Sequence, residues 1–114
     1  MEHSLRIQRF DSPIITPATD PSIGDNINGP SLIRAPDWVA RPLGRYSLYF
    51  AHHGGQFIRM AFADELTGPW NVYRPGVLAL ADCPCRNHVA SPDVHVDDSA
   101  RQIRMYYHGP ADGG

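Results

Sequence analysis

The chain has 114 residues, a length that fits a single domain by size alone. Ten basic residues, all arginine, and twelve acidic residues give a net charge of −2 without a basic stripe, which argues against nucleic acid as a partner. Eleven prolines and ten glycines favour turns and short strands over long helices.

The sequence shows no sign of a membrane or export segment. No apolar run approaches the roughly 20 residues that a membrane span needs. The N-terminus, MEHSLRIQRFDSP, lacks the apolar core of a secretory signal. The sequence therefore predicts a soluble protein with no membrane partner and, by default, a cytoplasmic location.

Residues 1–25 are rich in proline and show no sustained hydrophobic period. This pattern predicts an extended N-terminal arm, with one short edge strand around Ile14 and Ile15.

Residues 26–78 contain four stretches that read as successive antiparallel strands. The expected strands are 31–34, 45–51, 56–63 and 70–73. Alternation along the second strand puts Leu48 and Phe50 on one face and Ala51 on the other. In the third strand, alternation puts Ala61 on one face and Ile58 on the opposite face.

Residues 79–114 begin with a crossing segment, which leads to two further strands expected at 94–97 and 102–108. The chain then ends at a point where a third strand of the same unit should begin. Residues 79–114 are therefore expected to form the first half of a truncated second unit.

The two units repeat one sequence pattern. GPSLIR…RYSLYFAHHG at 29–54 matches SPDVHV…RQIRMYYHG at 91–109, and the two prolines that open the copies lie 62 positions apart. A strand-rich repeat of that length is typical of a β-propeller, which is built blade by blade. The sequence thus predicts an all-β fold, a partial propeller in which 26–78 is the first four-stranded blade.

Three stretches carry a resemblance to a known family: GPSLIR…RYSLYFAHH, IRMAFADELTGPW and SPDVHVDD…RMYYHG. Over residues 26–109 the chain resembles the five-bladed β-propeller glycoside hydrolases, which group family 43 arabinanases and xylosidases with invertases and levansucrases. The resemblance implies blades one and two of five, with the remaining blades as partners of this part. It also implies a carbohydrate substrate in a central funnel, cleaved by carboxylate acid–base chemistry without a cofactor.

The expected catalytic carboxylates depart from the family's pattern. The family's inner strand usually begins Asp-Pro, whereas this chain has Gly29-Pro30 and Ser91-Pro92. Asp93 is the nearest acid to the expected place, and Asp25 is the second candidate for the base. The general acid would lie in a later blade, so the 114 residues alone are expected to be inactive. A propeller that binds a carbohydrate or another small ligand without cleaving it is the alternative.

Several side chains are candidates for sugar binding. Polar groups at strand ends and an indole that can stack on a sugar face make up the set: Asn28, His52, His53, His88 and Trp38. Asn28 and the histidines also have a structural interpretation, as a turn residue and as polar strand ends.

Two features are left open by the sequence. Arg34 and Arg59 lie on expected strands, where each needs a carboxylate or a ligand as a partner, and an ion pair is the favoured use. Cys83 and Cys85 are separated only by Pro84, too close for an ordinary disulfide framework, and are expected to be loop residues and not half of a metal site. No metal is expected, because the histidines lack a ligand spacing.

Overall fold

The computed structural model describes residues 3–111 and contains two antiparallel sheets. The strands are β1 (Asn28–Arg34), β2 (Tyr46–Ala51), β3 (Phe57–Ala63), β4 (Asn71–Ala79), β5 (Ala90–Asp97) and β6 (Gln102–His108). They form a four-stranded sheet in the order β1-β2-β3-β4 and a β5-β6 hairpin. The described residues hold three single-turn 3₁₀ helices, η1 (Pro17–Thr19), η2 (Pro21–Ile23) and η3 (Leu80–Asp82), and no α-helix. The prediction of an all-β fold is confirmed.

Two strands begin earlier than predicted because a β-bulge replaces the expected turn. β1 starts at Asn28 and not at residue 31, and β5 starts at Ala90 and not at residue 94. In each strand two residues, the second a proline, face a single residue of the partner strand. A bulge leaves one residue without a ladder hydrogen bond, so it tolerates a proline, which has no N–H. Gly29-Pro30 and Ser91-Pro92 resemble turn sequences but therefore lie inside the strands.

β4 is also longer than predicted, running over 71–79 and not 70–73. Its register with β3 shifts between Ile58 and Met60, because residues 74–77 of β4 lie opposite the single residue Arg59 of β3. Pro75 and Gly76 are among these four residues. Gly76 has a φ of +74°, which allows the chain to bulge and then rejoin the ladder.

One side of the four-stranded sheet, called here the arm face, carries Leu48, Phe50 and Ala61. The N-terminal segment covers it, and Ile23 of η2 is buried in the same cluster. The predicted edge strand at Ile14 and Ile15 does not form. Both residues instead pack as half-buried side chains against this cluster. The apolar face of a sheet must be covered by another layer, and packing on that face buries both isoleucines more than pairing at a strand edge would.

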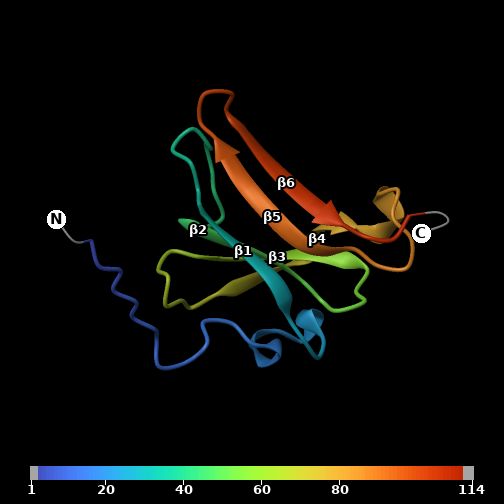
Figure 1. Cartoon of the computed structure of the whole chain (residues 1–114), viewed down its shortest axis with the longest axis horizontal. Coiled ribbons are helices and arrows are strands. Elements are labelled where there is room, and N and C mark those ends of the chain that lie inside the picture. Colours follow the sequence, from blue (N-terminus) through green and yellow to red (C-terminus); the bar gives the residue numbers. More distant parts are fainter. Residues whose placement is uncertain (1–2, 112–114) are drawn as a thin grey trace.

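The opposite side, called here the hairpin face, carries Ala51 and Ile58, both fully buried. The β5-β6 hairpin and the crossing segment cover it with Val89, Met105 and Tyr107 among others. Figure 1 shows the hairpin on one side of the four-stranded sheet and the N-terminal segment with its short turns on the other. The alternation of side chains predicted for β2 and β3 therefore places Leu48, Phe50 and Ala61 in the cluster on the arm face and Ala51 and Ile58 in the cluster on the hairpin face.

β1 and β5 lie next to each other, and their bulges are in contact. A Cβ added at Gly29 would lie 2.9 Å from the Cα of Ser91. One step further along, the backbone N–H of Val94 donates a hydrogen bond to Ser31 Oγ over 2.9 Å. The two copies of the repeat thus meet through equivalent edge strands.

Candidate functional site

Polar side chains gather at the start of β1 and the end of β2. The Nε2 atom of His52 lies 2.6 Å from Asp25 Oδ1. The side-chain amide of Asn26 donates to the same carboxylate oxygen over 3.2 Å. Because an ionised carboxylate only accepts hydrogen bonds, Nε2 of His52 carries the proton in this pair. In the neutral ring, Nδ1 then has the free lone pair.

Glycines make room for this histidine. Gly24, with a φ of +90°, lies so close that a Cβ there would be 3.0 Å from Cδ2 of the His52 ring. A Cβ at Gly55 would lie 2.8 Å from the Cβ of His52. The ring is therefore held between two backbone segments that lack side chains, which limits its orientation.

The charge state of Asp25 follows from its contacts. The hydrogen bond from His52, and next the positive charge of that ring when protonated, hold the pKa of the Asp25 carboxyl below its ordinary value. The side chain is 88% exposed, whereas that of His52 is 32% exposed. Asp25 is thus an accessible, ionised carboxylate that can accept a hydrogen bond from a sugar hydroxyl.

Two more of the predicted residues, Asn28 and His53, lie near this group, and the crossing segment brings a third, His88, close to it. Asn28 is half-buried and sits opposite Ala51, the residue before His52. The backbone N–H of His53 donates to Asn26 Oδ1 over 2.7 Å, and its side chain is exposed. Within the crossing segment, the N–H of Val89 donates to the Gly55 carbonyl.

That last hydrogen bond places the backbone of His88, the preceding residue, beside the β2-β3 turn. Five predicted residues therefore belong to one end of the first sheet, here called the entrance group: Asp25, Asn28, His52, His53 and His88.

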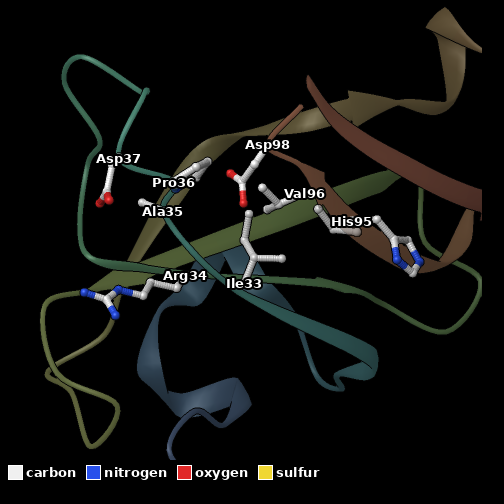
Figure 2. Close-up of a pocket in the computed structure, with 9 residues that line it drawn as sticks. Ile33, Arg34, Ala35, Pro36, Asp37, His95, Val96 and Asp98 are labelled. Atoms are coloured by element: carbon white, nitrogen blue, oxygen red, sulfur yellow. The ribbon is translucent and has the colours of Figure 1, made fainter. Parts of the chain in front are cut away.

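Trp38 lies elsewhere. Its indole Nε1 donates to Asp98 Oδ1 over 2.8 Å, which ties the loop after β1 to the turn between β5 and β6. A cavity of about 530 Å³ lies between these segments and is lined by Ile33 and Val96 among others. Figure 2 shows Arg34 and His95 pointing away from the middle of this cavity to opposite sides. Asp98, one of the carboxylates that line this cavity, already accepts from Trp38.

Asp93 does not join the entrance group. It points from the exposed face of the β5-β6 hairpin, where its Oδ2 lies 2.9 Å from His95 Nε2. The His95 ring meets Tyr106 of β6 edge-on, with ring centroids 5.8 Å apart. Asp93 and His95 are both more than half exposed, so this pair is a second, separate polar cluster.

Sequence reasoning missed the participation of Asn26, His95 and Asp98. Asn26 precedes the first predicted strand, and its side chain bonds Asp25 and the backbone of His53. His95 follows Asp93 by two residues, and strand alternation puts both on one face, which was the available signal. Nothing in the sequence indicates the long-range contact between Asp98 and Trp38.

Cys83 and Cys85 are free thiols, and both are half-buried against the core cluster on the hairpin face. Burial, and next the neighbouring Cys83 thiol, raise the pKa of Cys85. Among residues 3–111 no group of three or more His, Cys, Asp and Glu side chains could hold a metal ion. In the same part of the chain, no helix is long and apolar enough to cross a bilayer.

Comparison with known proteins gives one informative match. The chain is 34% identical over 100 residues to the uncharacterized protein R118 of Acanthamoeba polyphaga mimivirus. The match covers 73% of this chain but only 28% of the viral protein, so the chain spans little more than a quarter of that relative's length. No protein-family model and no solved structure matches the chain.

Proposed function

We propose that these residues form the first blade and half of the second blade of a five-bladed β-propeller that hydrolyses a carbohydrate. Two observations support the propeller. Equivalent bulged strands, β1 and β5, lie next to each other at the edges of their sheets. Each unit also offers one face to its neighbour, as blades do around an axis. The match covers only 28% of the viral relative, which is consistent with further blades.

In this proposal the entrance group forms one wall of the sugar site. The observation that carries it is the 2.6 Å contact between Asp25 and His52 at the head of β1. Propeller hydrolases of the type that the sequence resembles place their base at the head of an inner strand. In this proposal Asp25 is the base, as an exposed carboxylate oriented by His52, and Asn28 and His53 offer hydrogen-bonding groups to sugar hydroxyls.

Glycoside hydrolysis needs a second carboxyl group, protonated, on the other side of the scissile bond. In the proposal this acid comes from a later blade. Asp93 is the competing base, because it follows Pro92 at the head of β5, but its carboxylate faces His95 on the exposed side of the hairpin.

One observation favours binding without cleavage as the second candidate. At Gly29, where the family's pattern has aspartate, φ is +58° and a Cβ would lie 2.9 Å from Ser91 Cα. The packing of the two bulges therefore has no room for a catalytic side chain at that position. A carbohydrate-binding propeller that has lost the usual base would show this feature.

Hydrolysis of a panel of aryl glycosides tests the proposal, using the longest natural polypeptide that contains these residues. Asp25→Asn should lower kcat/KM more than about a hundredfold, the loss expected for a removed base. Asp11→Asn, an exposed carboxylate in the arm, is the control and should leave it unchanged.

A comparable loss in Asp93→Asn instead of Asp25→Asn would move the base to β5. Sugar binding without turnover would support the second candidate. Neither binding nor turnover with any sugar would contradict both.

A further inference from the structure

Arg59 on β3 is a half-buried cation without a carboxylate partner among residues 3–111. Its guanidinium carbon lies 5.3 Å from the centre of the Phe57 ring, two residues earlier on the same strand face. An aromatic face attracts a guanidinium but does not neutralise its charge. The ion pair expected for this arginine from the sequence is therefore absent in the described residues, and its charge is available to a ligand.

A pocket of about 310 Å³ lies beside this arginine, between η2 and the β2-β3 turn. Arg59, His52 and Gln56 are among the side chains that line it. Its volume lies at the lower end of the range for ligand sites, which suits a single sugar ring or a smaller group.

The nearby carboxylates leave the charge of Arg59 in place. Asp25 is bonded to His52 at 2.6 Å, and Asp20 forms an ion pair with Arg74 at 3.1 Å. Each is engaged with another partner, so the pocket combines a free guanidinium fork with the amide of Gln56. A planar fork of this kind binds a carboxylate or phosphate through two parallel hydrogen bonds.

We propose that this pocket binds the negatively charged group of an acidic sugar, a carboxylate or a phosphate, with Arg59 as its anchor. The charge preference rests on Arg59 and the pocket, whereas the sugar part of the ligand rests on the proposed function. His52 links the two, because it belongs to the entrance group and also lines the pocket. A sugar held at Asp25 would present an acidic substituent toward Arg59.

NMR titration of the 114-residue chain tests this without a variant. Glucuronate, glucose 6-phosphate, inorganic phosphate and glucose are added separately, and the backbone amides of Gly55 and Gln56 are followed. We expect saturable shifts with glucuronate or glucose 6-phosphate at concentrations where glucose gives none. The stronger of the two acids identifies the carboxylate or the phosphate as the preferred group.

Two results of the titration would overturn parts of the inference in distinguishable ways. Absence of shifts with every anion would overturn the anion site, and the proposed function would still stand if glucose or another neutral sugar bound. Equal affinity for inorganic phosphate and the sugar acids would keep the anion site but overturn the carbohydrate part.

Variants of Arg59 identify the anchor. Arg59→Gln should weaken binding of the preferred acid by about tenfold or more, since a charge-assisted hydrogen bond is lost. Arg59→Lys should retain part of the affinity, because the charge remains and the fork does not. Arg101→Gln, at the exposed β5-β6 turn, is the control and should bind as wild type.

Unchanged affinity in a folded Arg59→Gln variant would overturn the role of Arg59. If that variant does not fold, the wild-type titration decides the matter.

Discussion

β1 and β5 begin with the same bulge, but the residues that follow it are buried in opposite order. Leu32 is 46% exposed and Ile33 is 9% exposed. At the equivalent positions of β5, Val94 is 6% exposed and the His95 side chain is 58% exposed. Val94 lies against the first sheet, whereas His95 faces away from it. Local sequence thus repeats the strand geometry, and the neighbours of each face decide which side chain is buried.

The two bulges also differ in which residues they allow, and the difference again depends on the neighbouring segments. Gly29 and Ser91 both have left-handed backbones, with φ of +58° and +52°. Ser91 is exposed and carries its side chain there at the cost of some backbone strain. Gly29 cannot carry one, because its missing Cβ would point at the backbone of Ser91. A repeated position therefore becomes obligatory for glycine in only one copy.

The largest expected effect lies in the core of the first sheet. Phe50 is completely buried among residues of the arm face, so Phe50→Ala should lower the free energy of unfolding by about 4 kcal/mol. Tyr106→Ala on the hairpin, at a 61% exposed site, should cost only about 1 kcal/mol, for the lost ring contact with His95. Chemical denaturation measures both, and similar losses would contradict the assignment of the main core to the first sheet.

The contact between the bulges comes next. Gly29→Ala should cost about 3 kcal/mol, because left-handed strain and a clash with the Ser91 backbone add together. Gly54→Ala is the matched control: φ is +71° there, but a Cβ would meet nothing within 4 Å, so only strain of about 1 kcal/mol is expected. Equal costs in thermal or urea unfolding would show that the two bulges do not touch.

A smaller effect is expected for the hydrogen bond between the two units. Ser31→Ala removes the acceptor of the Val94 N–H and should cost about 1.5 kcal/mol. Ser47→Ala on β2 is the control and should change stability by less than about 0.5 kcal/mol, since no described hydrogen bond uses that hydroxyl. Hydrogen exchange of the Val94 amide should rise in the first variant alone, and an unchanged rate would count against the bond.

The smallest effect concerns pH at the entrance group. The pKa of Asp25 is lowered in the folded chain, so its bond with His52 contributes stability above the ordinary carboxyl pKa of 3.8 and loses it as pH falls through the lowered value. Carboxyl ¹³C NMR should show a midpoint below 3.8 in wild type, and His52→Ala should return it toward 3.8. In His53→Ala the midpoint should stay low, because the His53 side chain makes no bond to Asp25 in the described structure. A midpoint unaffected by His52→Ala would exclude the pair.

The sequence by itself determined the strand content, the repeat and the two faces of β2 and β3. These follow from side-chain alternation, which is a local property of extended backbone. It also singled out all five residues of the entrance group, since polar residues at strand ends and before prolines stand out against apolar runs. It placed the starts of β1 and β5 too late, because Gly-Pro and Ser-Pro look alike in a turn and in a bulge.

Only the tertiary structure decided which of these residues meet. Asp25 and His52 are 27 residues apart, Trp38 and Asp98 are 60 apart, and no local pattern encodes either pair. The same holds for the separation of Asp93 from the entrance group and, among the described residues, for the lack of a carboxylate paired with Arg59. Such contacts depend on how two sheets and an arm stack to bury their apolar faces, and burial constrains only which face is covered, not which polar groups end up beside it.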